Sequence, residues 1–215
     1  VLLNGIAGSG KTHFLCDLAK HRIDRGQPTF IYLGEEISTR NPWGAIKGFL
    51  KIALPDEEFL AALNRYAAAK RTRAVIIVDA VNESLARPYW AQLNKVKRFK
   101  NLAIVLSVRS GFEHSDLPTS ILNDYVRVEH PGFAEHEWEA VTKFFKEYKL
   151  PLLEVPLLFP EFRIPLFLKI FCESFAGSRQ AIKGHYGFTY IFEQYVKRQG
   201  VALLKRLGET AHIGE

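Results

Sequence analysis

The first twelve residues carry the pattern that most constrains the fold of this chain. Residues 5–12 read G-I-A-G-S-G-K-T, which matches G-x-x-x-x-G-K-[ST], and they lie between the apolar residues 1–3 and a helical pattern that starts at His13. Glycines let a backbone curl so that its N–H groups, together with the positive end of the following helix, surround phosphate groups. The order of strand, loop and helix argues against a chance glycine-rich turn. The sequence therefore predicts a phosphate-binding loop and a nucleoside triphosphate as its ligand.

The residues of this loop have distinct expected roles. Lys11 is expected to reach the β- and γ-phosphates, and the Thr12 hydroxyl is expected to coordinate Mg²⁺. The other positions bring backbone N–H groups to the phosphates. The expected ligands are ATP or ADP with Mg²⁺. The expected nucleotide-binding residues of this segment are Gly5, Ala7, Gly8, Ser9, Gly10, Lys11, Thr12 and His13.

Short apolar runs alternate with helical patterns over the first 131 residues. The run A-V-I-I-V is continuously apolar, which is typical of a strand buried on both faces of a parallel sheet. Asn41 and Pro42 form a helix cap followed by a first-turn proline. Strands that alternate with helices favour a three-layer αβα domain around a parallel sheet. Besides the first strand, the expected strands are 29–33, 74–78, 102–108 and 125–128, and later helices are expected over 56–70 and 84–99.

Beyond residue 131 the pattern becomes helical. Apolar residues recur at helical spacing over 138–148, and four prolines between positions 151 and 165 separate short segments. Further helices are expected over 165–175 and 189–207, and no further strand is expected. We therefore predict a P-loop nucleotide-binding α/β domain at 1–131 and a helical lid or second subdomain at 132–215.

Two acidic residues follow the third expected strand. Asp79 ends the apolar run, where an acid of a P-loop protein holds Mg²⁺, and the alternative is an aspartate that only caps a turn. Glu83 lies four residues later in D-A-V-N-E and is the candidate general base that would orient or deprotonate the attacking water. The alternative for Glu83 is a carboxylate in a helix first turn, where it suits the helix dipole.

Arg109 directly follows the fourth expected strand in V-L-S-V-R-S-G. A cation at that edge of the sheet can sense or stabilise the γ-phosphate. A surface arginine that pairs with an acidic residue is the other interpretation. The predicted catalytic set is thus Lys11, Asp79, Glu83 and Arg109, and the predicted metal ligands are Thr12 and Asp79.

The net charge of +6 raises the question of a nucleic-acid partner. The densest basic cluster alternates with Val96 and Phe99, as expected for the solvated face of a helix near its C-terminus. We therefore expect no specific nucleic acid. The basic residues of this cluster are Lys95, Lys97, Arg98 and Lys100.

Other features of the composition bear on location. No apolar stretch approaches the roughly 18 residues of a membrane span, so no membrane partner is expected. The two cysteines, Cys16 and Cys172, are far apart without metal-site spacing, which favours reduced thiols and, with the nucleotide motif, the cytoplasm. The chain contains no methionine and opens inside an expected strand, so we expect it to be a piece of a longer protein.

Six segments along residues 1–176 carry a family resemblance. In chain order they read G-I-A-G-S-G-K-T, N-P-W-G-A-I, V-I-I-V-D-A-V-N-E, V-L-S-V-R-S, H-P-G-F and F-P-E-F-R-I-P-L-F-L-K-I-F-C. In this order they resemble the NTPase core of STAND proteins, the NACHT-like signalling ATPases, and are most similar to bacterial antiviral STAND proteins of the Avs type. The first and third segments are shared by many NTPases, whereas the order of all six is more specific.

The resemblance implies an additional-strand, AAA+/STAND-like P-loop fold and a slow ATPase that acts as a switch. ATP would favour an open, homo-oligomeric form and ADP a closed one. An effector domain would precede this core and a target-sensing region would follow it in the same parent chain. Pro165 matches the proline of the helical lid that contacts the nucleotide in such proteins, although many relatives carry Asn or Gly where this chain has Arg163 and Ile164.

Two other functions use the same loop. An AAA+-type remodelling ATPase would act on nucleic acid or protein and would use arginine-rich loops, which the sequence lacks. A small-molecule kinase would need a lid with several arginines for the donor phosphates, and the early lid contains few. A signalling ATPase in antiviral defence is therefore the favoured prediction.

Overall fold

The computed structural model describes residues 1–37, 40–151, 160–177 and 188–207. The chain divides into two compact units, Val1–His130 and Pro131–Glu215, and each is described by itself. No helix among the described residues has the length and apolar character needed to cross a membrane.

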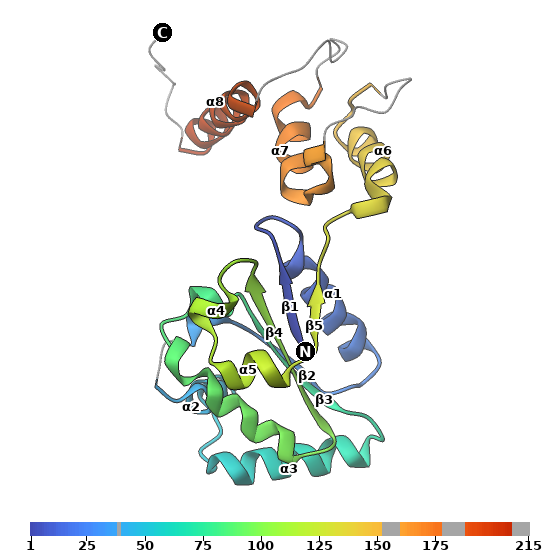
Figure 1. The fold of residues 1–215 in the computed structure, drawn as a ribbon. Helices are drawn as coiled ribbons and strands as arrows, with labels where there is room; N and C mark the ends of the chain where they lie inside the picture. Colours follow the sequence, from blue (N-terminus) through green and yellow to red (C-terminus); the bar gives the residue numbers. More distant parts are fainter. Residues whose placement is uncertain (38–39, 152–159, 178–187, 208–215) are drawn as a thin grey trace. The chain divides into compact units, whose positions relative to one another are not determined.

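A parallel five-stranded sheet forms the centre of the first unit, with strand order β2-β3-β4-β1-β5 (Figure 1). Strand β4 lies between β1 and β3, so the strand that leads into the phosphate loop does not pair with the strand that ends in Asp79. The register places Arg109 opposite Gly5. The strands are β1 Leu2–Gly5, β2 Thr29–Leu33, β3 Ala74–Asp79, β4 Leu102–Arg109 and β5 Arg127–Glu129.

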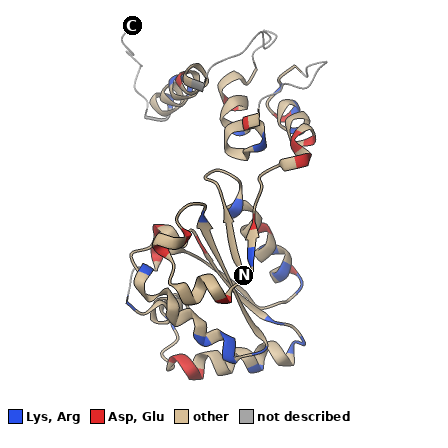
Figure 2. Ribbon diagram, viewed as in Figure 1, with Lys and Arg blue, Asp and Glu red and all other residues tan. Residues whose placement is uncertain are grey.

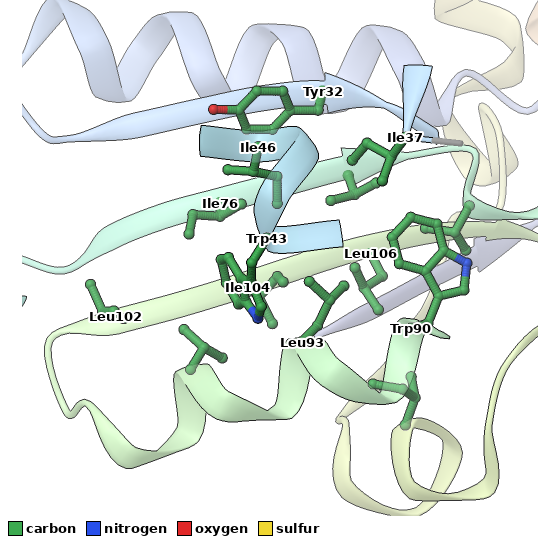
Figure 3. Close-up of a cluster of buried hydrophobic side chains, with 14 of the residues drawn as sticks. Tyr32, Ile37, Trp43, Ile46, Ile76, Trp90, Leu93, Leu102, Ile104 and Leu106 are labelled. Atoms are coloured by element: carbon green, nitrogen blue, oxygen red, sulfur yellow. The ribbon is translucent and has the colours of Figure 1, made fainter. Parts of the chain in front are cut away.

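Helices cover both faces of this sheet. Helix α1 (Lys11–Asp24) packs Leu15 and Ala19 on one face, against apolar side chains of β1 and β3. The opposite face carries the larger core, in which Trp43 and Trp90 are fully buried (Figure 3). This core is covered by α2 (Pro42–Phe49), α3 (Asp56–Ala69), the 3-10 helix η3 (Arg87–Arg98) and α5 (Thr119–Asp124). The result is the predicted three-layer αβα arrangement.

Three parts of the first unit differ from expectation. The helix predicted over 84–99 is a 3-10 helix that begins only at Arg87, because the Ser84 hydroxyl donates to the Ile37 carbonyl and accepts the Ala86 N–H, which holds the preceding segment in a turn. Strand β5 begins at Arg127, two residues later than predicted. The short helix α4 (Glu113–Asp116), like α5, was not predicted.

The regular secondary structure of the second unit is helical throughout its described residues. It contains helices α6 (Glu137–Glu147), α7 (Pro165–Phe175) and α8 (Phe188–Leu207), with short 3-10 turns at Ala134–His136, directly before α6, and at Pro160–Arg163, shortly before α7. Aromatic rings hold its core together: the ring centroids of Phe145 and Phe171 are 6.0 Å apart, and those of Phe162 and Phe171 are 5.0 Å apart. No strand occurs among the described residues after β5.

Candidate active site at the carboxyl edge of the sheet

The loop between β1 and α1 has the backbone conformation that its glycines predict. Gly8 and Gly10 adopt φ angles of 74° and 99°, in the left-handed region that favours glycine. At Gly5 a Cβ atom would lie 2.8 Å from the His130 carbonyl oxygen, so no side chain fits there. Gly10 caps α1 without a side-chain acceptor, and the N–H groups of the first helical turn remain available to an anion.

The Lys11 ammonium lies over this loop and among the other predicted charged residues. Its Nζ donates to the carbonyl oxygens of Gly5 at 2.8 Å and Ile6 at 3.0 Å. Burial lowers the pKa of Lys11 from its ordinary value; Asp79 and Glu83 oppose this shift, and Arg109 adds to it. The fold thus brings Asp79, Glu83 and Arg109 within electrostatic range of Lys11.

Asp79 is buried and bonded through both carboxylate oxygens. The Thr12 hydroxyl donates to Oδ2 at 2.6 Å, and the Ser107 hydroxyl donates to Oδ1. Ser107 in turn accepts the Ala80 N–H at 2.8 Å. Because these bonds come from α1 and β4, Asp79 does more than cap its own turn. A hydroxyl and a carboxylate in contact are hard oxygen ligands of the kind that Mg²⁺ prefers.

The segment after Asp79 is held in an unusual conformation. Ala80 has a φ of 54°, and its carbonyl packs against Gly34 so closely that a Cβ atom at Gly34 would collide with it. The same segment is tied to β4, because the Asn82 side-chain oxygen accepts the Arg109 N–H at 3.0 Å. Arg87 Nη2 donates to the Asn82 carbonyl at 2.6 Å. The position of Glu83 is thus fixed from several sides.

Glu83 ends the 3-10 turn η2 (Val81–Glu83) and is exposed. Its N–H donates to the Ala80 carbonyl at 2.9 Å. Its carboxylate makes no hydrogen bond or ion pair with any part of the chain that the structure describes. A carboxylate that is near Lys11 yet unpaired is available to accept a proton from water.

The backbone of Arg109 is fixed by the bond to Asn82. Within the described ranges no carboxylate lies within ion-pair distance of its guanidinium, which argues against the surface ion pair considered above. The guanidinium carbon lies 5.8 Å from the centroid of the Phe112 ring. The charge of Arg109 acts on Lys11, and the register places the Arg109 backbone opposite Gly5, so both cations belong to this edge of the sheet.

Sequence reasoning missed Ser107, Asn82 and His130. Ser107 is a buried serine within the apolar strand β4. A polar residue inside such an apolar run was the feature of the sequence that could have indicated a buried polar contact. His130 follows β5, and its ring centroid lies 5.6 Å from that of Phe14 on α1. Burial lowers the pKa of His130, and the charge of Lys11 lowers it further. His130 and Asn82 lie in segments that carry the family resemblance, but nothing in the local sequence predicts their contacts, because strand order brings them to this edge of the sheet.

Pro165 begins α7 in the second unit, and its contact with a nucleotide stays a prediction. Within that unit the segment before it packs on the H-P-G-F segment: Phe133 N–H donates to the Arg163 carbonyl at 2.8 Å, and Gly132, with a φ of 74°, leaves no room for a side chain beside Arg163. Two of the segments that carry the family resemblance therefore meet in the fold.

No cluster of three or more His, Cys, Asp or Glu residues that could hold a metal occurs in the described ranges. The bonded oxygens of Thr12 and Asp79 still fit Mg²⁺, because this ion is commonly held by one or two protein ligands together with phosphates and waters.

Comparisons with known proteins bear on the fold. A scan against protein-family models finds no match, and neither does a search of curated proteins. Among solved structures, the chain is similar to Cdc6p from Pyrobaculum aerophilum, with 15% identity, a TM-score of 0.53 and coverage of 97% of this chain and 56% of that one. It is also similar to AMPPCP-bound DnaA from Aquifex aeolicus, with 14% identity, a TM-score of 0.50 and coverage of 95% and 55%. This chain thus spans little more than half of either protein. The likeness confirms the predicted fold class, a three-layer αβα fold around a parallel sheet followed by a helical part.

Proposed function

We propose that this chain binds ATP with Mg²⁺ at the β1–α1 loop and hydrolyses it. The observation that carries this proposal is the loop itself: Lys11 lies over the Gly5 and Ile6 carbonyls, the start of α1 has no side-chain cap, and Thr12 is bonded to Asp79. A lysine and uncapped helical N–H groups on one loop favour a ligand of high negative charge. A triphosphate supplies that charge.

The chain's own residues divide the work of this site. Lys11 and the loop N–H groups bind the phosphates, while Thr12 and Asp79 would hold Mg²⁺, which when bound neutralises phosphate charge. Ser107 keeps the Asp79 carboxylate oriented. Glu83 accepts the proton of the attacking water, and Arg109 stabilises charge on the γ-phosphate.

The finer proposal is a nucleotide-controlled switch of the STAND type. The resemblance described above supports it, as does the packing of Gly132 against Arg163, which joins two of its segments. In this proposal ATP favours a homo-oligomeric form of the parent protein, which carries effector and sensor domains in the same chain. Antiviral signalling in the cytoplasm is the role that this proposal assigns.

A remodelling ATPase of the AAA+ class is the second candidate, because the fold likeness to Cdc6p and DnaA is compatible with it. The charge distribution is less favourable to a nucleic-acid substrate. Three basic residues of the expected cluster are ion-paired: Lys95 with Asp56, Lys97 with Asp124 and Arg98 with Glu57. Figure 2 shows Lys and Arg mixed with Asp and Glu over the helices of the first unit.

Calorimetric titration with ATP and Mg²⁺ tests the binding step. Lys11→Ala should abolish binding, because it removes the cation that contacts the β- and γ-phosphates. Lys20→Ala, an exposed lysine on the same helix, is the matched control and should bind as the unaltered chain does. Equal affinity in the Lys11 and Lys20 variants would refute the assignment. Sub-micromolar binding of DNA or RNA at physiological salt would instead favour the remodelling ATPase.

Steady-state turnover of Glu83→Gln tests the catalytic step. This variant should bind ATP normally and hydrolyse it about 10²–10⁴-fold more slowly, since a general base contributes to the chemical step and little to affinity. Unchanged turnover would leave Glu83 as a turn residue. Glu58→Gln, an exposed glutamate of α3, is the control.

Hydrogen exchange over residues 132–176 tests the switch. A lid responds to nucleotide only if it interacts differently with ADP and ATP. Exchange should be slower with ADP than with ATP, and Pro165→Ala should reduce that difference. Equal protection with both nucleotides, in a chain shown to bind each, would remove the moving part of the model.

A further inference from the structure

Three consecutive backbone N–H groups at the end of β4 donate to three different elements. Arg109 N–H donates to the Asn82 side chain at 3.0 Å, Ser110 N–H to the Gly5 carbonyl at 3.0 Å, and Gly111 N–H to Glu113 Oε2 at 2.7 Å. These acceptors belong to η2, β1 and α4. The backbone that carries the Arg109 side chain is therefore fixed from three sides.

Glu113 connects this segment to the strand before the phosphate loop. While Oε2 accepts the Gly111 N–H, Oε1 accepts the side-chain amide of Asn4 at 3.2 Å, and Asn4 directly precedes Gly5. Burial alone would raise the pKa of Glu113, but hydrogen bonds from its own amide, Asn4 and Gly111 outweigh it, and the pKa lies below its ordinary value. The carboxylate is therefore charged at neutral pH and occupied on both oxygens.

The Gly5 carbonyl shows why this connection matters for the site. It accepts both Lys11 Nζ at 2.8 Å and Ser110 N–H at 3.0 Å, so the loop lysine and the segment that carries Arg109 share one acceptor. If Glu113 releases Gly111, the segment loses one of its three attachments. A shift of the segment then changes the distance between the guanidinium and the phosphates that Lys11 contacts.

We propose that Asn4 and Glu113 are positioning residues for Arg109, and that the hydrogen bond between them sets the preference of this site for a nucleoside triphosphate over a diphosphate. The inference rests on the proposed function and deepens it. The loop N–H groups contact phosphates that ATP and ADP share, and Lys11 reaches the β-phosphate of both as well as the γ-phosphate of ATP. Arg109 acts on the γ-phosphate alone, which only ATP has. A displaced Arg109 therefore weakens ATP binding and leaves ADP binding nearly unchanged.

The test measures the dissociation constants of ATP and ADP for Glu113→Gln. A glutamine offers one acceptor to the two donors, so either Asn4 or Gly111 loses its partner. ATP affinity should fall roughly tenfold, as for one misplaced charged contact, and ADP affinity by less than about twofold. Asn4→Ala removes the hydrogen bond to Glu113 from the β1 side and should have the same effect on ATP and ADP affinity. It is the alternative variant if Glu113→Gln folds poorly. Glu58→Gln is the matched control.

A double-mutant cycle with Arg109→Ala separates positioning from a general structural effect. In the Arg109→Ala background, Glu113→Gln should not weaken ATP binding further. An equal loss in both backgrounds, or an equal loss of ATP and ADP affinity, would overturn the proposal.

A nucleotide-free measurement separates failure of this inference from failure of the proposed function. Amide exchange at Ser110 and Gly111 should quicken in Glu113→Gln without nucleotide. Unchanged exchange would overturn the inference, and this result does not depend on which nucleotide the chain binds. If the unaltered chain binds neither nucleotide, the proposed function fails, and the nucleotide preference that rests on it fails with it.

Discussion

Different kinds of interaction stabilise the interiors of the two units of this chain. In the first unit, polar side chains at the ends of parallel strands join elements that are distant in sequence. Ser107 of β4, for example, bonds to the Asp79 carboxylate and the Ala80 amide at the end of β3. In the second unit the corresponding role falls to aromatic rings, with Phe145 and Phe162 packed around Phe171 on α7. The candidate chemistry therefore concentrates where buried polar groups require specific partners.

This contrast has a physical basis. A buried polar group is costly unless each of its bonds is made, so a satisfied network permits only one arrangement of the elements that carry it. Apolar packing depends on volume and tolerates small shifts at lower cost. A site that must hold Lys11, Asp79 and Arg109 in register is thus better built on the first kind of interaction.

The largest expected effect is on the aromatic core of the second unit. Phe171→Ala should destabilise that unit by about 3–5 kcal/mol, because it removes a fully buried ring that contacts its neighbours on two helices and a turn. Hydrogen exchange should quicken in α6 and α7, while strands β1, β3 and β4 keep their protection. Leu166→Ala, half exposed on the same helix, is the control. Equal loss of protection in the sheet would show that the two units unfold as one.

A comparison of two buried serines tests the contrast directly. Ser107→Ala leaves the Asp79 carboxylate and the Ala80 amide each short of a partner, which should cost about 1–3 kcal/mol. Ser174→Ala, in the second unit, removes a hydroxyl that only donates to the Ile170 and Ile191 carbonyls of helices α7 and α8, and it should cost less than about 1 kcal/mol. Denaturant unfolding gives both values. A larger loss of stability for Ser174→Ala than for Ser107→Ala would show that the second unit depends more on its buried polar contacts than the first, which is the opposite of the proposed contrast.

The elements that sequence predicted well are those with a strong local pattern. Strand β2 and helix α7 have the predicted bounds, because each is an apolar run closed by a glycine or opened by a proline. The phosphate loop is equally local, since its glycines and Lys11 are adjacent in sequence. Local chemistry also predicted that Asn41 caps α2, and its side chain accepts the Gly44 N–H at 3.1 Å.

The parts that sequence did not predict depend on strand order. Ser107 meets Asp79 only because β4 lies between β1 and β3, and no spacing along the chain encodes that neighbour. The same holds for Asn82, which bonds to the end of β4, and for Glu113, whose helix α4 has only four residues and no periodic pattern. A single sequence therefore does not predict these long-range partners, although the residue types at the strand ends were informative about the candidate site.

The smallest expected effect concerns the helix caps of the two units. Asn41→Ala removes the side-chain acceptor of the Gly44 N–H and should cost about 1 kcal/mol. His136 occupies the same position before α6 but makes no capping hydrogen bond, and its contacts with Glu135 and Glu139 are exposed and near 4 Å, so His136→Ala should cost less than about 0.5 kcal/mol. Asn41→Ser, which retains an acceptor, should recover most of the loss. Neither Asn41 nor His136 belongs to the proposed nucleotide-binding or catalytic residues, so ATP affinity should not change in any of these variants. If His136→Ala proves as costly as Asn41→Ala, the stability of the second unit also depends on specific polar contacts at its helix ends. The contrast between the two units would then hold only for their buried cores.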